Sequence, residues 1–188
     1  LAEAGYRLHW SGKWHVSVTE SPKDRGWEEG LVSCDARAHH GQPWEWYQRL
    51  AGQPEPAERG EGQILRPGYG AYALYGTRRE NPASHDERVV AEAAEAVGRL
   101  SRAREPWVVY AGLVGPHDPY FVPSRFLDLY DPDEVPLPAA YEDDLSDKPR
   151  VYGRMRRQRF GQLTPREVRE AVRHFWAYCT YLDELFGR

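Results

Sequence analysis

Helical spacing of apolar residues marks two long segments of the chain. Each begins with a capping box, Ser84-His-Asp-Glu87 in the first and Thr164-Pro-Arg-Glu167 in the second, which also has proline at its first helical position. The first box precedes six apolar residues that share one helix face: Val89, Val90, Ala93, Ala94, Val97 and Leu100. The second precedes a stripe with steps of three and four: Val168, Val172, Phe175, Cys179, Leu182 and Phe186. We therefore predict a helix of about five turns after Ser84 and the strongest helix of the chain after Thr164.

Two further apolar runs have the length and composition of strands. Residues 5–16 form an alternating, aromatic-rich run broken at Gly12, which predicts a strand that leads into a loop. Residues 107–114 are continuously apolar, as is typical of a strand buried on both faces of a parallel sheet, and a polar loop follows them. The order helix, buried strand, polar loop predicts an α/β fold, in which ligands bind at the carboxyl ends of the strands.

The remaining segments have no clear period. Residues 20–82 hold proline, glycine, tryptophan and arginine without regular spacing, which predicts an irregular excursion with short elements. Residues 120–150 are rich in proline and aspartate and are predicted to follow an extended surface path with short turns.

Composition and charge narrow the class of protein. The length of 188 residues fits one domain or a large piece of a bigger one, and 13% aromatic residues exclude a disordered chain. A mean hydropathy of −0.77 and the lack of a long apolar run exclude a membrane span. A net charge of −4 provides no overall positive charge that would favour binding to nucleic acid. Two cysteines cannot form a disulfide scaffold or a four-cysteine zinc site.

Both ends of the chain look cut. It begins without an initiator methionine or a signal segment, and it stops at Arg188 directly after the last periodic stretch. We therefore expect an internal fragment, and we leave the location of the complete protein open.

The first predicted strand ends in residues that carry chemistry. Lys13 and His15 flank Trp14, and residues two apart in an extended segment point to the same side, so Trp14 is expected to turn into the core. An ammonium offers positive charge to an oxyanion, and an imidazole accepts or donates a proton near pH 7. A solvated edge strand is the alternative interpretation of this pair. His117, held between two prolines after the second apolar run, favours a site for an anionic substrate.

These residues resemble a known family. Ser11-Gly-Lys-Trp-His15 is similar to the Gly-Lys-Trp-His signature of the formylglycine-dependent sulfatases of the alkaline phosphatase superfamily, and Pro116-His-Asp-Pro119 is similar to that family's Pro-His-x-Pro. Leu137-Pro138, Lys148-Pro149 and the stretch 178–187 follow in the family's order. The resemblance implies a sulfatase-like sheet flanked by helices, incomplete at both ends. It also implies that residues 1–188 are part of a single catalytic domain.

The resemblance implies roles for five residues. Lys13 would bind a sulfate oxygen, and His15 would hydrogen-bond the formylglycine hydrate and help to expel sulfate. His117 would contact the sulfate near the leaving-group oxygen, and Asp118 and Tyr120 would line the substrate side. The implied partner is a small-molecule or saccharide sulfate ester, and sugar, aryl and choline sulfates all remain open.

Other parts of the family's site are missing from this sequence. The nucleophile lies in Cys-x-Pro-x-Arg or Cys-x-Ala-x-Arg upstream of Gly-Lys-Trp-His, whereas Cys34-Asp-Ala-Arg37 lies downstream and has its arginine one position too early. The carboxylates that bind the family's divalent metal, expected to be calcium, have no counterpart here either. We therefore expect formylglycine and all metal ligands outside this chain, and no turnover by the chain alone.

Two other functions remain open at this point. A phosphonate or phosphate ester hydrolase of the same superfamily would use the same lysine and histidines, because they serve either tetrahedral anion. A non-catalytic sulfatase-like remnant would keep only affinity for anions. Elsewhere, His39-His40 is interpreted as a solvated loop, and the basic run at 154–159 as a solvated face.

Overall fold

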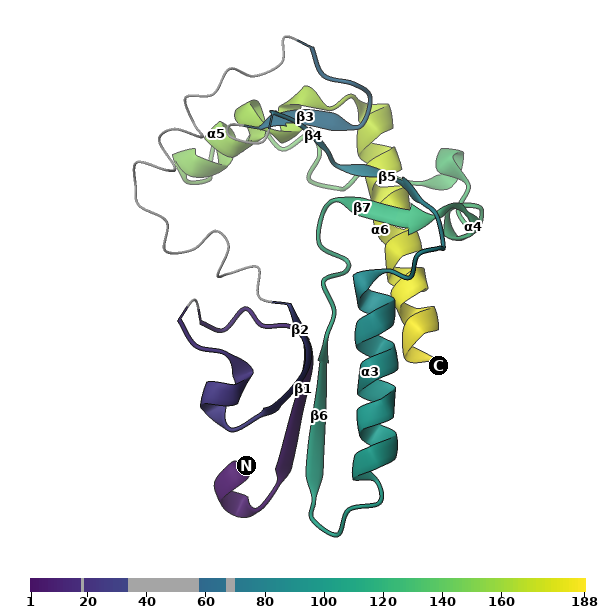
Figure 1. The fold of residues 1–188 in the computed structure, drawn as a ribbon. Coiled ribbons are helices and arrows are strands. Elements are labelled where there is room, and N and C mark those ends of the chain that lie inside the picture. The colour runs from purple at the N-terminus through teal and green to yellow at the C-terminus, as the bar shows by residue number, and fades with distance from the viewer. Residues whose placement is uncertain (18, 34–57, 67–69) are drawn as a thin grey trace. The chain divides into compact units, whose positions relative to one another are not determined.

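The computed structural model describes residues 1–17, 19–33, 58–66 and 70–188 (Figure 1). Contacts divide the chain into two compact units, and each is described by itself. The first unit comprises Leu1–Gln42, Glu80–Gly115 and Leu182–Arg188. The second unit comprises Pro43–Arg79 and Pro116–Tyr181. Within the described ranges, no helix is long and apolar enough to cross a membrane.

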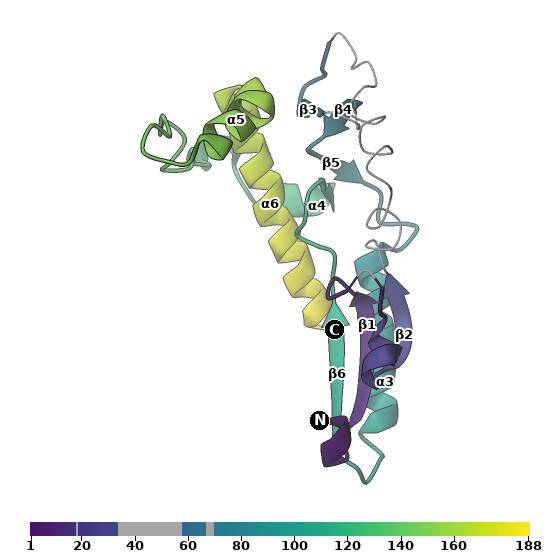
Figure 2. The same ribbon diagram turned by 90° about the vertical axis from the view of Figure 1, so that its left-hand side faces the viewer.

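Among its described residues, the first unit contains a parallel three-stranded sheet with a helix packed on it. β1 (Arg7–Lys13) lies between β2 (Glu28–Ser33) and β6 (Trp107–Gly112), and both pairings are parallel. α3 (His85–Leu100) contacts all three strands and runs along the sheet (Figures 1 and 2). The unit also contains two 3-10 helices: η1 (Ala2–Ala4) and η2 (Pro22–Arg25). This arrangement confirms the predicted α/β class.

The capping box that predicts α3 is present. The Ser84 hydroxyl accepts a hydrogen bond from the Glu87 backbone N–H, and the Glu87 carboxylate accepts one from the Ser84 backbone N–H. The helix ends at Leu100, where the sequence predicts its end. The predicted apolar face is only partly correct, because Ala96 is buried while Val97 is exposed. The small alanine side chains let the helix pack closely on the sheet, which an apolar count alone does not show.

β6 differs from the prediction for residues 107–114. Gly112 is the one residue of β6 that is buried, and Tyr110 is 46% exposed. β6 pairs with β1 along one side, and among the described residues it has no strand on its other side. Within the described residues β6 is therefore mostly half-buried rather than buried on both faces, because burial depends on what covers the faces of the sheet, which an apolar run alone does not show.

β2 is a sheet strand that the sequence pattern missed. It lies inside residues 20–82, and its burial changes from exposed at Glu28 and Glu29 to half-buried at Ser33. Two acidic residues followed by glycine are poor strand formers, so the segment has no strand pattern of its own. The register of β2 on β1 shifts between Trp10 and Gly12, as at a β-bulge.

The second unit consists of short strands and helices. β3 (Gln63–Arg66) pairs antiparallel with β4 (Gly70–Ala73), and β5 (Tyr75–Arg78) pairs parallel with β7 (Tyr120–Pro123). The helical elements are α4 (Ser124–Leu127), η3 (Pro132–Glu134), α5 (Arg150–Gln158), η4 (Phe160–Gln162) and α6 (Pro165–Phe186), of which α6 from Leu182 onward is assigned to the first unit. One core cluster combines Ile64, Leu74, Leu163 and Ala171.

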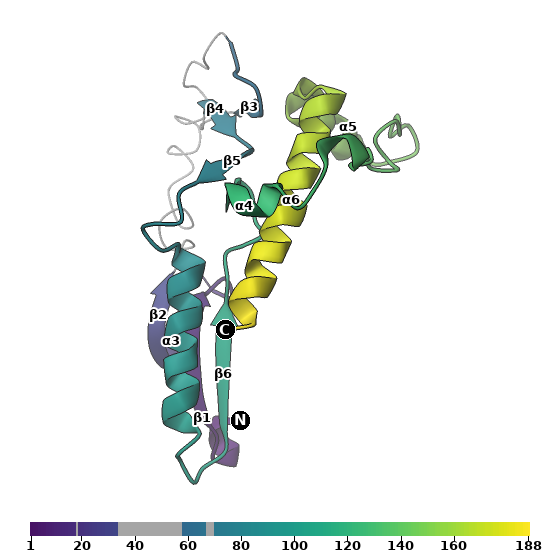
Figure 3. The ribbon, with the colours of Figure 1, turned by 90° about the vertical axis from the view of Figure 1, so that its right-hand side faces the viewer.

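α6 confirms the predicted helix after Thr164, but of the predicted stripe only Leu182 is buried. Its buried residues include Ala171, His174, Ala177, Tyr181 and Leu185. Phe175 of the predicted stripe is 37% exposed, and Phe186 is 65% exposed. α4 lies beside α6 (Figure 3), where the rings of Phe126 and Tyr181 pack with centroids 5.3 Å apart. The packed face therefore includes alanines and the polar His174, which a stripe of large apolar residues does not mark.

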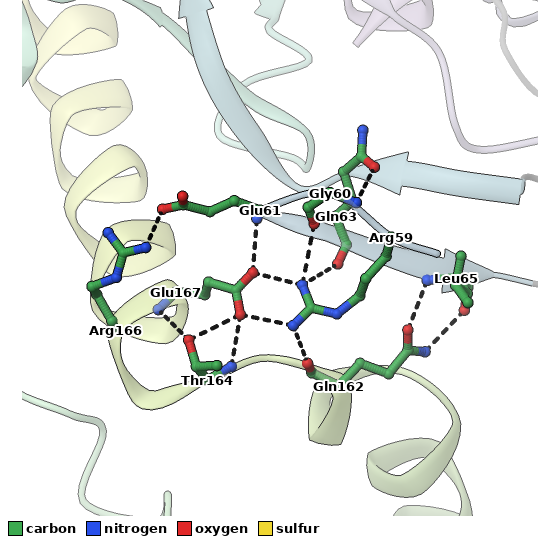
Figure 4. A network of polar contacts seen from close by, with 10 residues as sticks. Arg59, Gly60, Glu61, Gln63, Leu65, Gln162, Thr164, Arg166 and Glu167 are labelled. Carbon is green, nitrogen blue, oxygen red and sulfur yellow. Dashed lines mark hydrogen bonds and ion pairs between the residues drawn. The ribbon is translucent and has the colours of Figure 1, made fainter. Parts of the chain in front are cut away.

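A polar network joins Arg59, four residues before β3, to the start of α6 (Figure 4). The Arg59 guanidinium makes a bidentate ion pair with Glu167, at N–O distances of 2.6 and 2.9 Å. It also donates hydrogen bonds to three backbone carbonyls, those of Gly60, Gln63 and Gln162. The charge and the hydrogen-bond donors of Arg59 are therefore used within the fold.

Glu167 is equally well satisfied. It accepts hydrogen bonds from the Gly62 backbone N–H and from the backbone N–H and hydroxyl of Thr164, the capping residue of α6. The Arg59 guanidinium is the main reason that the pKa of the Glu167 carboxyl lies well below its ordinary value. The carboxylate is therefore charged at neutral pH although its side chain is only 5% exposed.

Candidate functional site

Lys13 is the last residue of β1, at the carboxyl edge of the parallel sheet. The preceding Gly12 has φ +93°, and a Cβ at this position would lie 2.0 Å from the Gly112 carbonyl oxygen on β6. Gly112 is similarly crowded, because its Cβ would lie 2.8 Å from the Lys13 carbonyl oxygen. Glycine is therefore required at the closest approach of the two strands, and the backbone of Lys13 is held against β6.

Trp14 continues from the strand end into the core. It is 3% exposed, which confirms the prediction that it turns inward. Its backbone N–H donates to the Ser33 carbonyl at 3.0 Å, and its indole Nε1–H donates to the Glu20 carbonyl at 2.7 Å. The ring meets that of Trp10 edge-on, with centroids 4.8 Å apart. Trp14 is thus fixed through both its backbone and its side chain.

An aromatic cluster extends this packing across the sheet. Trp10 stacks on Tyr110 at a centroid distance of 3.8 Å and meets Trp27 edge-on at 5.3 Å. Aromatic pairs with these geometries add about 0.5–1.5 kcal/mol each to the stabilisation from buried area. The strand that ends at Lys13 is therefore rigidly supported.

Lys13 and His15 lie on either side of the buried indole. Lys13 is half-buried and His15 is exposed. In the part of the chain that the structure describes, the Lys13 ammonium forms no hydrogen bond or ion pair. An unpaired ammonium on a fixed strand end, with an imidazole two residues later, is suited to holding a tetrahedral oxyanion.

His117 and Asp118 lie in the second unit, between β6 and β7. The His117 side chain is 59% exposed, and its Nδ1 lies 2.6 Å from the Asp118 carbonyl oxygen and 3.1 Å from Asp118 Oδ1. Asp118 Oδ2 accepts a hydrogen bond from the Tyr72 hydroxyl at 3.0 Å. The structure therefore brings His117 and Asp118 together. Their convergence with Lys13, which belongs to the first unit, stays a prediction.

Tyr120 opens β7 close to these residues. Its backbone N–H donates to the Leu74 carbonyl at 2.8 Å, and its ring meets Phe175 edge-on at 5.6 Å. Burial raises the pKa of the Tyr120 hydroxyl, and the Asp118 carboxylate raises it further. The hydroxyl therefore remains protonated at neutral pH and is available as a hydrogen-bond donor.

Asp86 is a positioning carboxylate that sequence reasoning missed. It is 3% exposed, and its two oxygens accept hydrogen bonds from the backbone N–H groups of Val114 and Gly115, at 2.8 and 3.0 Å. These bonds fix the end of the segment that leads to His117. The sequence shows an acidic residue in the first turn of a helix, which the helix dipole already explains. Its partners lie 28 and 29 positions away and leave no local trace.

An apolar pocket of about 740 Å³ lies within the second unit, and Tyr120 contributes to its wall. Val168, Val172 and Phe175 of the predicted α6 stripe also line it. Among the described residues of the lining, Arg156 is the only charged one, and its guanidinium donates to the Tyr141 and Asp143 carbonyls. The lining therefore suits an uncharged, apolar group.

The described residues offer no metal centre. Among them, no three histidine, cysteine, aspartate or glutamate side chains lie close enough together to hold a metal ion. Cys34 and the pair His39-His40 lie outside the described residues. The residues that the structure describes therefore do not supply a calcium site.

Comparison with known proteins gives two matches. The sequence model of the family described as "Sulfatase" matches residues 1–188. The chain is also similar to the choline-sulfatase of Rhizobium meliloti (strain 1021), with 27% identity over 211 residues. That match covers 100% of this chain and 36% of the relative, so the chain spans little more than a third of the length of that protein.

Proposed function

Because the chain belongs to the sulfatase family, we propose that it carries the sulfate-binding part of the active site of a sulfuric ester hydrolase. Its parallel sheet with a packed helix is consistent with the fold of that family. Since it spans 36% of the choline-sulfatase that it matches, the proposal places the rest of the site elsewhere in a longer protein.

The end of β1 carries this proposal. Lys13 leaves the sheet at its carboxyl edge, between Gly12, which packs against β6, and the buried Trp14. A cation carried on a fixed strand end can stabilise charge on a sulfuryl oxygen. Binding the sulfate group is therefore the role of Lys13.

Proton transfer is assigned to His15 and His117. His15, two residues after Lys13, is close enough along the chain to act on the same sulfate group, and it assists the departure of sulfate after the ester is cleaved. His117 donates a proton or hydrogen bond to the leaving oxygen, with Asp118 beside its Nδ1. In the complete enzyme a formylglycine would supply the covalent acceptor for the sulfuryl group and calcium would supply Lewis acidity, both from residues outside this chain.

The proposed substrate is a small-molecule or saccharide sulfate ester. Asp118 and Tyr120 are assigned to the substrate side, where the Tyr120 hydroxyl can donate a hydrogen bond to an ester oxygen. Choline sulfate is a candidate through the name of the relative, and an aryl sulfate is a candidate because the pocket at Tyr120 is apolar.

Hydrolysis assays on the full-length protein test the proposal. The Lys13→Ala variant should lose ~10²–10³ in kcat/KM on an aryl sulfate, as when one oxyanion donor is removed. Lys23→Ala is the matched control, because Lys23 is an exposed lysine of the same unit, on η2 rather than at a strand end. It should retain the wild-type rate and melting temperature.

Parallel assays separate the alternatives. Choline, aryl and sugar sulfates rank the substrates, while phosphate and phosphonate esters test the nearest enzyme alternative. Higher kcat/KM on the phosphorus esters would overturn the assignment to sulfate, and an unchanged rate for Lys13→Ala would overturn the role of the lysine. The isolated 188-residue chain should show no turnover, since it lacks the nucleophile, and measured turnover would contradict that part of the proposal.

A further inference from the structure

We propose that Trp14 is a positioning residue, which directs Lys13 through its backbone and His15 through its indole N–H. This inference rests on the proposed function, since it concerns the same two residues. The indole is 3% exposed, so it does not touch the substrate and can act only through its neighbours.

The backbone of Trp14 fixes Lys13 from the carboxyl side. Its N–H donates to the Ser33 carbonyl at 3.0 Å and so continues the pairing of β1 and β2 past the last strand residue. On the other side of Lys13, Gly12 is pressed against Gly112 so closely that a Cβ would collide with its carbonyl oxygen. Lys13 is therefore held between two immobile neighbours, and its ammonium starts from a defined backbone direction.

The indole of Trp14 closes the loop that contains His15. Its Nε1–H donates to the Glu20 carbonyl at 2.7 Å, six positions along the chain. The far end of this loop is held by Ser17, whose hydroxyl oxygen accepts hydrogen bonds from the backbone N–H groups of Thr19 and Glu20, both at 3.2 Å. His15 thus lies between Trp14 and Ser17, whose side chains both make hydrogen bonds to the backbone of Glu20, although its own side chain is exposed.

Holding this loop in place matters for catalysis, because small displacements of the catalytic groups lower the rate. A substitution at a residue that does not touch the substrate can lower the rate ~10²-fold if it displaces the catalytic groups by about 1 Å. The arrangement therefore predicts that the indole N–H, and not only the bulk of the ring, is needed for activity. Phenylalanine separates the two, because it retains an aromatic ring against Trp10 and removes the donor to Glu20.

The experiment compares Trp14→Phe with Trp27→Phe in the full-length protein. Trp27 belongs to the same aromatic cluster, 5.3 Å from Trp10, and serves as the control for lost indole packing. Trp14→Phe should lower kcat/KM on an aryl sulfate by about tenfold or more. It should also raise the inhibition constant of inorganic sulfate and shift the pH profile of kcat/KM, whereas Trp27→Phe should change none of the three.

The inhibition constant and the pH profile distinguish positioning from folding. A variant that merely lowers the fraction of folded molecules lowers the rate but leaves both readouts unchanged. Ser17→Ala loosens the same loop without touching the core, and it should shift both readouts in the same direction by a smaller amount. Ser17→Ala also decides the matter if Trp14→Phe does not fold.

The inference is overturned if these variants keep the wild-type inhibition constant and pH profile while Lys13→Ala loses activity. If Lys13→Ala is itself fully active, the proposed function fails first, and the inference fails with it.

Discussion

The end of β1 and the start of α6 use positive charge in opposite ways. At the start of α6, Arg59 meets a buried carboxylate and three carbonyl oxygens, so its charge and its donors are consumed within the fold. At the end of β1, the ammonium of Lys13 has no such partner in the described part of the chain, while the backbone around it is tightly fixed.

The difference separates a charge that builds the fold from one that is available to a ligand. A cation surrounded by acceptors gains nothing from an added anion, because its donors are already bonded. A cation on a rigid backbone without an internal partner can give its full interaction to a bound oxyanion. Substitutions should therefore change stability at the start of α6, and chemistry more than stability at the side chain of Lys13.

Arg59→Ala is expected to cause the largest loss of stability. Removing the half-buried Arg59 leaves the buried Glu167 carboxylate without its cation, which costs about 3 kcal/mol in the free energy of unfolding. Thermal unfolding measures the loss, and the rate per folded molecule should not change. Arg166→Ala is the control, because the ion pair of Arg166 with Glu61 is exposed and contributes about 1 kcal/mol or less. Equal losses for the two arginine variants would break the comparison.

Gly12→Ala should come next in size and should affect both stability and rate. The new methyl group would collide with the Gly112 carbonyl, and the positive φ disfavours alanine as well, so about 3 kcal/mol is expected. Gly98→Ala on α3 is the control. A Cβ at Gly98 meets nothing within 4 Å, so this change should stabilise the helix by about 0.5–1 kcal/mol. A Gly12→Ala variant as stable as the wild type would show that the strand end is not rigid.

Asp86→Asn should destabilise the protein by about 2 kcal/mol, because the amide keeps one acceptor for Val114 and Gly115 and replaces the other with a donor. It should also lower activity, since the bonds that fix the segment before His117 are disturbed. Glu95→Gln, an exposed position on the same helix, is the control. Chemical denaturation combined with the sulfate ester assay measures both effects, and a variant that loses neither would remove Asp86 from the description of the site.

Acid should weaken the start of α6 gradually. The pKa of Glu167 is lower in the folded state than its ordinary value of 4.5, so its contribution is complete above that pH and declines as the pH falls below it. Glu167 alone should lower the free energy of unfolding by about 1.4 kcal/mol for each pH unit that the pH falls below this value. Glu167→Gln should remove this slope, which denaturation curves between pH 5 and pH 3 would show. An identical slope in the variant would assign the acid sensitivity to other carboxylates.

Local signals account for the elements that the sequence predicts correctly. The capping boxes at Ser84 and Thr164, with their periodic apolar residues, determine α3 and α6 because each signal lies within the helix it describes. The inward turn of Trp14 follows from strand alternation in the same way.

Contacts between distant residues account for the failures. β2 forms a strand because β1 lies beside it, although its own residues favour no strand. The partners of Asp86 are 28 and 29 positions away, and Arg59 reaches Glu167 over 108 positions, so neither contact has a local pattern. The same contacts decide which face of a helix is buried. In α6, Leu182 of the predicted stripe is buried, whereas Val172 and Phe175 line a pocket.

The aromatic cluster behind Lys13 also gives the protein an optical reporter. Trp10 has three ring partners at 3.8–5.3 Å in fixed orientations, and one of them, Trp14, directly follows the lysine. Near-ultraviolet circular dichroism depends on such fixed packing and disappears when side chains lose their unique arrangement. The cluster therefore contributes to that band without any label, and comparing wild type with Trp14→Phe while inorganic sulfate is added would show how far the strand end adjusts when the anion binds.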